Sequence, residues 1–214
     1  SSSLSDGASN YFHIRAVDNA GNWSSPVHFG PFYIDTTNPT DPIDLTSTSH
    51  TASTWSNDNT IDISWTAATD TDGSGVDGYS YTWDTTADSV IDTSKDIEEG
   101  ITTLTSAVLD DGDSHYFHIR TKDNVGNWTA TEHLGPFYID TTNSSGPSSF
   151  LSSSHTVSTW SSDATVDISW TAATDTGGSG LDGYSYTWDT TTDTTPNTSK
   201  DIEEGITSLT SSSL

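Results

Sequence analysis

The chain has 214 residues and a net charge of −26, with 31 acidic residues against 5 basic ones. A surface this acidic repels phosphate groups, which excludes nucleic acids and anionic membrane surfaces as partners. There is no Cys, so no disulfide stabilises the chain, and no apolar run reaches membrane-spanning length.

The chain opens on what we interpret as the end of a domain. Residues 11–23, YFHIRAVDNAGNW, predict a strand followed by a tight polar loop, and residues 30–35, GPFYID, predict a short last strand. Side chains alternate between the two faces of a strand, which places His13 on the outward, solvated face.

Further strand patterns follow, separated by turns rich in Gly and Asp. In TIDISWTAA, Ile61, Ile63 and Trp65 face one way. The same alternation occurs in YSYTWD and in YFHIRTKD, where His118 takes the outward face. SKDIEEGI, residues 94–101, is too short for a helix, and we interpret it as an edge segment or a turn. No stretch combines a helical period with caps, so we expect an all-β fold of short antiparallel strands.

An internal repeat explains why an ending stands first. Matched residues are 105 positions apart without a gap, as in Tyr11 with Tyr116, and the first four residues match the last four. A unit of this length is a domain rather than a solenoid turn. We place the boundaries in the turn-rich stretches DTTNPTDP and DTTNSSGP. The predicted parts are residues 1–38, the C-terminal part of a repeat; residues 39–142, a complete repeat; and residues 143–214, the N-terminal part of the next.

The strand motifs together resemble the fibronectin type III and bacterial Ig-like sandwiches. Trp65 in ISW is similar to the buried tryptophan of the second strand, YSYTW is similar to the third strand, and LDDGDSHYFHIRTKDNVGNW is similar to the run from the E–F turn into the F–G loop. The resemblance implies antiparallel two-sheet β-sandwiches in tandem, head to tail, with strands F and G at the start of the chain and strands A to E at its end. The family's corner tyrosine falls near His115 and Asn10, one place before Tyr116 and Tyr11, so the corner contact is either rebuilt or missing.

The sharpest chemical hypothesis is a calcium site at each domain junction. In such a sandwich the B–C and F–G loops share one pole, and the preceding domain's E–F turn and exit arrive there. Ca²⁺ binds six to eight oxygens, and a cluster of carboxylates without a cation would repel itself. The first junction gathers Asp6, Asp35, Asp41, Asp70, Asp72, Asp123, Asn124 and Asn127, and the second gathers Asp110, Asp111, Asp113, Asp140 and Asp175.

The resemblance also implies a calcium pattern. Giant bacterial adhesins built from Ig-like repeats carry a D-x-A-G-N … D-T-T pattern and bind calcium between domains. The matching residues are Asp18, Asn19, Asp35, Asp123, Asn124 and Asp140. Two alternatives to calcium stay open: DNAGN is a good tight turn in itself, and a high-salt habitat also selects acidic residues. An EF-hand loop starting at Asp70 is not favoured, because the second copy has Gly177 in place of Asp72.

No catalytic arrangement is found. The seven His form no Ser-His-Asp ordering or zinc spacing, and Asp is too frequent for pairs to indicate acid–base catalysis. Exposed Trp side chains could stack on sugars, and Trp23 and Trp128 follow the polar loops. Trp in a sandwich more often packs in the core or seals a junction, which also applies to Trp55 and Trp160.

We expect a structural repeat of an extracellular filament, stalk or adhesin shaft, whose partners are neighbouring identical repeats. The alternative is a spacer or carbohydrate-binding accessory module of a secreted hydrolase, with glycans as partners. We expect the chain to be an excerpt of a longer covalent array. In the other assembly, chains polymerise by strand complementation, with residues 143–214 supplying the first strands of a sandwich and residues 1–35 of the next chain the last two.

Overall fold

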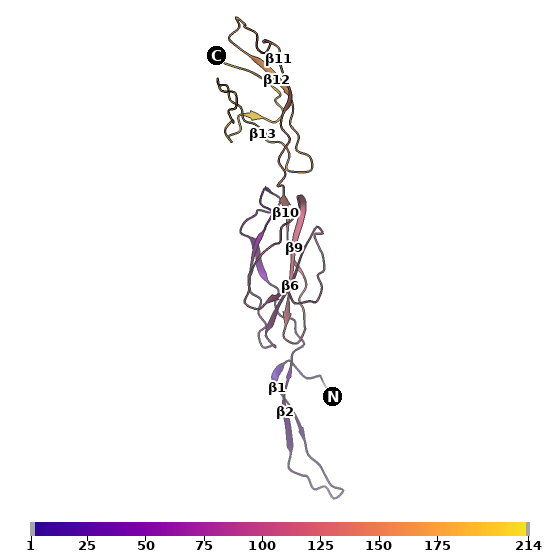
Figure 1. Cartoon of the computed structure of the whole chain (residues 1–214). Helices are drawn as coiled ribbons and strands as arrows, with labels where there is room; N and C mark the ends of the chain where they lie inside the picture. The colour runs from indigo at the N-terminus through magenta and orange to yellow at the C-terminus, as the bar shows by residue number, and fades with distance from the viewer. Residues whose placement is uncertain (1–2, 213–214) are drawn as a thin grey trace. The chain divides into compact units, whose positions relative to one another are not determined.

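The computed structural model describes residues 3–212, which contain strands and turns but no helix (Figure 1). The chain divides into two compact units, Ser1–Tyr138 and Ile139–Leu214. The prediction of an all-β fold is therefore confirmed for the described residues. Within residues 3–212, no helix is long and apolar enough to cross a membrane.

The first unit begins with an antiparallel hairpin of strands β1 (Gly7–Ile14) and β2 (Val27–Ile34). Both predicted strands are present, but strand β1 begins at Gly7 rather than Tyr11, and strand β2 begins at Val27 rather than Gly30. The alternation does not bury the apolar face here, because Phe12 is 54% exposed and Ile14 is 55% exposed.

Two antiparallel sheets follow in the same unit. Trp65 from one sheet and Phe117 from the other pack with their ring centroids 6.2 Å apart, so the sheets enclose a shared core. This confirms the predicted two-sheet sandwich, and the strand order is consistent with a fibronectin type III-like domain. One sheet has the order β3 (Ile43–Ser47), β5 (Asp62–Thr66), β8 (Thr103–Thr105), and the other the order β4 (Trp55–Ser56), β10 (Glu132–Ile139), β9 (Gly112–Asp123), β6 (Val76–Asp84), β7 (Ile97–Glu98).

Along strand β5, every second side chain points into the core. Ile61, Ile63 and Trp65 are at most 5% exposed, whereas Asp62 between them is exposed. Phe117 from strand β9 is completely buried against them. Each such side chain contributes about 1.5 to 3 kcal/mol through burial.

The corner contact of the family is rebuilt without its tyrosine. In the family, a tyrosine hydroxyl bonds to the backbone a few residues upstream. Here Nε2 of His115 lies 2.8 Å from the carbonyl oxygen of Asp110. In the hairpin, Nδ2 of Asn10 donates to the carbonyl oxygen of Ser5 at 3.1 Å. A histidine and an asparagine thus bond back to the turns that precede strands β9 and β1.

Strand β7 is the edge strand that the segment SKDIEEGI was expected to supply. It pairs with strand β6 through Gly78↔Glu98 and Tyr79↔Ile97. Gly78 has φ +150°, and a Cβ at this position would collide with the carbonyl oxygen of Ile97. Glycine is therefore required for the two backbones to approach this closely.

The second unit carries the same strand patterns in a less complete sandwich. The rings of Trp170 and Tyr184 meet edge to face at 5.5 Å, as those of Trp65 and Tyr79 do. Its strands are β11 (Ser148–Ser152), β12 (Asp167–Thr171) and β15 (Ser208–Thr210) in one sheet, and β13 (Gly183–Tyr184) with β14 (Ile202–Glu203) in another. Strand β13 has 2 residues where strand β6 has 9, because strand β9 pairs along strand β6 and no described strand takes that place beside β13.

Candidate functional site

Three of the predicted calcium ligands lie close together. Asp35 follows strand β2, Asp70 lies in the loop after strand β5, and Asp123 ends strand β9. One carboxylate oxygen from each lies within 4.8 Å of the others, and Asp123 is completely buried. In the described part of the chain, no other set of three acidic or histidine side chains is this close. Since these loops share one pole of the sandwich, residues far apart in the sequence meet here.

Backbone N–H groups hold each of these carboxylates in place. Asp35 Oδ2 accepts a hydrogen bond from Ser74 N at 2.7 Å, and Asp70 Oδ2 accepts one from Gly75 N at 2.8 Å. The hydrogen bonds from Ser74 hold the pKa of the Asp35 carboxyl below its ordinary value, against desolvation and the charge of Asp6. Asp35 is therefore ionised at neutral pH.

Asp123 is held by the loop that follows it. Its Oδ1 accepts from the backbone N–H groups of Val125, Gly126 and Asn127 at 3.0, 2.6 and 2.7 Å. Its Oδ2 accepts from Nδ2 of Asn127 at 2.7 Å. These donors offset part of the cost of burying the charge. The loop DNVGN therefore acts as a tight turn around a buried carboxylate.

Asp6 lies beside this group rather than in it. Its carboxylate accepts hydrogen bonds from Thr36 N at 3.1 Å, from Thr36 Oγ1 at 2.9 Å and from Thr37 Oγ1. The bonds from Thr37 and Thr36 lower the pKa of Asp6. Asn127 Nδ2 also donates to the Thr37 carbonyl oxygen at 3.1 Å. The segment of residues 35–37 is therefore hydrogen-bonded both to Asp6, which precedes strand β1, and to Asn127, which follows strand β9.

Half of an equivalent group is present in the second unit. Asp140 Oδ2 accepts from Ser179 N at 2.7 Å, and Asp175 Oδ2 accepts from Gly180 N at 2.8 Å. These bonds match those of Asp35 and Asp70 one repeat earlier. The residue that matches Asp123 within this chain is Asp18, which is exposed in the hairpin loop and is held by Ala20 N and Asn22 N in the same way.

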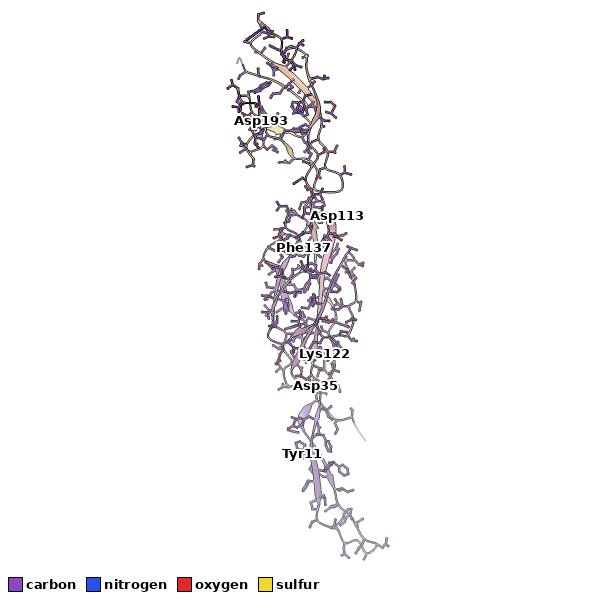
Figure 2. All side chains as sticks on the ribbon, in the orientation of Figure 1. Tyr11, Asp35, Asp113, Lys122, Phe137 and Asp193 are labelled. Carbon is purple, nitrogen blue, oxygen red and sulfur yellow. The ribbon has the colours of Figure 1, made fainter. Side chains whose placement is uncertain are left out.

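The remaining predicted ligands lie elsewhere or have other roles. Asn124 Nδ2 donates to the carbonyl oxygens of Ser74 and Gly75, so it braces the loop beside the group. Asp113 lies at the end of the sandwich away from Asp35 and Lys122 (Figure 2). The other candidates outside the three-carboxylate group are Asn19, Asp41, Asp72, Asp110 and Asp111, of which all but the half-buried Asp41 are exposed.

The expectation that His118 is solvated is wrong. Its side chain is fully buried, although it lies on the outer face of strand β9 as the alternation predicted. Its Nδ1 lies 2.6 Å from Nδ1 of His133, and its Nε2 lies 3.1 Å from Asp84 Oδ1. Arg120, next on the same face, donates from Nε to the carbonyl oxygen of Asp92 at 3.1 Å. The segment that follows strand β6 therefore covers this outer face.

Two of the candidate tryptophans are covered by cations. The guanidinium of Arg120 lies 4.7 Å from the ring centroid of Trp128, and that of Arg15 lies 4.3 Å from Trp23. Stacked cations stabilise each ring and occupy a face that a sugar would need. Trp160 is fully exposed. The sequence pattern did not distinguish it from the other tryptophans.

No family model matches the chain. Two curated enzymes contain a similar stretch. Exoglucanase B of Cellulomonas fimi is 31% identical over 193 residues, which cover 81% of this chain and 15% of that enzyme. Chitinase A1 of Niallia circulans is 33% identical over 162 residues, which cover 72% of this chain and 20% of that enzyme. The chain thus spans a fifth or less of the length of these relatives.

Proposed function

We propose that the chain is a non-catalytic spacer module of an extracellular, polysaccharide-degrading protein. The observation that carries this proposal is the asymmetry of the similarity, which covers 81% of this chain but only 15% of exoglucanase B. A stretch of that kind is one module within a longer enzyme. The strongly acidic surface suits a spacer, because like charge keeps modules soluble and apart.

The open reading frame that encodes the chain tests this proposal directly. We expect it to encode a glycosidase domain as well. In that protein, removal of this module should lower hydrolysis of insoluble cellulose or chitin and leave hydrolysis of a soluble oligosaccharide unchanged. The competing function, a filament, stalk or adhesin shaft, is supported by the repeat of 105 residues. A reading frame holding many further repeats and no glycosidase domain would favour that function and contradict ours.

A carbohydrate-binding module is the less favoured form of the same proposal. Arg15 and Arg120 each occupy one ring face of the tryptophan beside them. We therefore expect the chain not to co-sediment with insoluble cellulose or chitin. Binding that is lost in both Trp23→Ala and Trp128→Ala, and kept in Trp160→Ala, would contradict the spacer role.

We also propose that Asp35, Asp70 and Asp123 bind one Ca²⁺ ion. Support comes from the three carboxylate oxygens within 4.8 Å of one another, together with the full burial of Asp123. Carboxylate oxygens are the ligands that Ca²⁺ prefers, and a divalent cation removes their mutual repulsion. An ion here would join the segment after strand β2 to two loops of the sandwich, which would stiffen that connection.

Calcium titration with matched variants tests the site. We expect Ca²⁺ to raise the melting temperature of the wild-type chain and a chelator to lower it, at a fixed ionic strength. Asp70→Asn should abolish this shift. Asp72→Asn is the matched control, because Asp72 lies two residues away, is exposed and is outside the group. A shift of equal size in both variants, or one reproduced by NaCl alone, would show that only surface charge is being screened.

A further inference from the structure

Two histidines meet on the outer face of the complete sandwich. His118 comes from strand β9 and His133 from the neighbouring strand β10. Their Nδ1 atoms lie 2.6 Å apart, and their rings meet edge to face with centroids 4.9 Å apart. His118 is fully buried, whereas His133 is exposed. Two imidazole nitrogens therefore converge at a point that an ion can approach from the side of His133.

The other ring nitrogen of His118 is bonded to a carboxylate. Its Nε2 lies 3.1 Å from Oδ1 of Asp84, the last residue of strand β6. An ionised carboxylate only accepts hydrogen bonds, so Nε2 of His118 carries the hydrogen and donates it. In the neutral ring, Nδ1 of His118 then has a lone pair that faces His133. Without an ion, Nδ1 of His133 supplies the hydrogen between the two rings.

This arrangement matches the surroundings of a metal-binding histidine. Such histidines nearly always donate their second ring nitrogen to a carboxylate, a carbonyl or water, which orients the ring and makes the ligand nitrogen more basic. Asp84 is itself held in place, because its Oδ1 also accepts a hydrogen bond from Thr86 N at 2.8 Å. The buried His118 is thus oriented before any ion arrives, and only the exposed His133 has to adjust.

The histidine pair recurs in the hairpin with the same separation. His13 of strand β1 lies opposite His28 of strand β2 in register, and their Nδ1 atoms are also 2.6 Å apart. The residue before the second histidine changes from Val27 to Glu132 between the copies, while the histidine stays. The facing pair therefore belongs to the repeat rather than to one copy of it.

We propose that His118 and His133 bind one Cu²⁺ ion between their Nδ1 atoms, with Asp84 orienting His118. Imidazole nitrogen suits Cu²⁺, and Cu²⁺ binds a given nitrogen site more tightly than the other common divalent metals. On binding, the hydrogen on Nδ1 of His133 would move through solvent to Nε2 of that ring, which stays neutral. Water would supply the remaining ligands on the exposed side. The net charge of −26 favours the approach of any cation.

The separation of the two nitrogens favours Cu²⁺ over Zn²⁺. With metal–nitrogen bonds of about 2.0 Å, adjacent ligands of a square-planar ion lie about 2.8 Å apart. Two ligands of a tetrahedral Zn²⁺ ion lie about 3.3 Å apart. The observed 2.6 Å is closer to the first value, and a small rotation of the exposed His133 ring would supply the difference.

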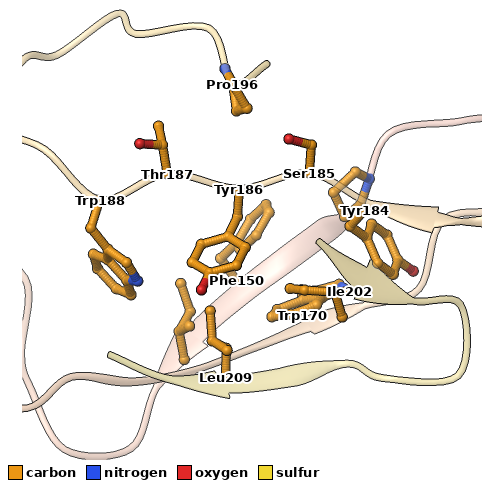
Figure 3. A pocket seen from close by; sticks show the side chains of 12 residues that line it. Phe150, Trp170, Tyr184, Ser185, Tyr186, Thr187, Trp188, Pro196, Ile202 and Leu209 are labelled. Carbon is orange, nitrogen blue, oxygen red and sulfur yellow. The ribbon is translucent and has the colours of Figure 1, made fainter. Parts of the chain in front are cut away.

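The groove of the second unit offers no competing site for the ion. Figure 3 shows it lined by Trp170, Tyr186 and Trp188, with Phe150 and Leu209. None of the lining residues that the structure describes has an imidazole, a carboxylate or an amine. The three-carboxylate group can compete for Cu²⁺, but it offers oxygen ligands and no nitrogen.

Electron paramagnetic resonance of bound Cu²⁺ tests the site, because each coordinated nitrogen splits the copper signal. The measurement uses the His28→Ala variant, so that only the pair in the sandwich remains. With one equivalent of Cu²⁺ at neutral pH, and excess Ca²⁺ to occupy carboxylates, we expect splitting by two nitrogens. Adding His133→Ala should remove this pattern. Adding His155→Ala instead is the matched control, because His155 bonds to Ser154 in the second unit and belongs to neither pair.

Copper affinity and thermal melting separate a metal site from a structural hydrogen bond. Asp84→Asn in the same variant should weaken Cu²⁺ binding about ten- to a hundredfold, because the carboxylate that orients His118 is lost, and should keep both nitrogen couplings. Cu²⁺ should raise the melting temperature of His28→Ala, since an ion bound only by the folded state stabilises it. It should not do so once His133→Ala is added.

Two results would overturn the proposal. One is a spectrum of His28→Ala with splitting from fewer than two nitrogens. The other is the same two-nitrogen spectrum after His133→Ala is added, which would place the ion elsewhere. Neither result bears on the three-carboxylate group, because Ca²⁺ is present throughout and the histidines lie outside that group.

Discussion

The complete sandwich of the first unit and the strands of the second unit have nearly the same sequence, yet they differ in structure. Strand β6 runs for 9 residues, whereas its match β13 runs for 2. Trp55 begins a short strand beside strand β10, whereas Trp160 is fully exposed and outside any strand. The missing partners are strands β9 and β10. The comparison shows that the full length of strand β6 and the short strand β4 depend on strands β9 and β10. Strands β11, β12 and β15, which match β3, β5 and β8, pair without such partners.

The largest effect should separate Phe117 of strand β9 from its match in the repeat, Phe12 of strand β1. Phe117→Ala should cost about 3 to 5 kcal/mol of the free energy of unfolding, because Phe117 is fully buried between two tryptophans. Phe12→Ala should cost little in the dilute monomer, because Phe12 is 54% exposed. Urea unfolding followed by circular dichroism gives both values. Similar losses in the two variants would mean that the hairpin already has a packed partner in the monomer.

A smaller effect should separate Trp55, which follows strand β3, from Trp160, which follows strand β11. Trp55→Ala removes a ring contact with Tyr138, worth about 1 kcal/mol beyond the lost burial. Trp160→Ala should change stability by less than about 0.5 kcal/mol, because the side chain contacts little. Thermal melts of the two variants make the comparison. A clear loss of stability in Trp160→Ala at low protein concentration would show that other residues of the same chain pack on Trp160.

The smallest effect should appear in the acid range. Hydrogen bonds from Lys95 and Lys122 lower the pKa of the Asp77 carboxyl, whereas Asp182 in the second unit is 83% exposed and is bonded by Lys200. A carboxyl whose pKa is lowered by folding contributes stability above its unfolded pKa and loses it as the pH falls through the folded value. The loss of stability below about pH 4 should therefore shrink in Asp77→Asn, by less than about 1 kcal/mol.

Unfolding measured between neutral pH and about pH 3 gives this difference. An unchanged loss of stability in Asp77→Asn would mean that the bonds from Lys95 and Lys122 do not stabilise the folded state through the Asp77 carboxylate.

The sequence predicted the parts of this molecule that depend on local pattern. The alternation of Ile61, Ile63 and Trp65 identified a core face, because a strand turns successive side chains to opposite sides. It did not predict the burial of His118, because alternation says which side a residue takes and not which loop covers that side.

For the candidate site, the sequence predicted which residues lie near one another but not which of them form the group. Asp35, Asp70 and Asp123 were among the residues assigned to one pole, and their carboxylates lie close together. The sequence could not select them from so many Asp residues, since the selection depends on loop geometry. It also could not show that backbone N–H groups hold each carboxylate. Whether these residues bind calcium stays a prediction.

The close approach at Gly78 has a consequence for synthesis on the ribosome. The pairing of strands β6 and β7 returns as Gly183↔Glu203 and Tyr184↔Ile202 in the second unit, where no described strand matches β9 or β10. The two glycines have φ +150° and +156°, and both face a carbonyl oxygen that excludes a Cβ. This contact joins residues about twenty positions apart, so it can form as soon as both have left the exit tunnel. A nascent repeat would then have this edge formed while strands β8, β9 and β10 had still to leave the tunnel.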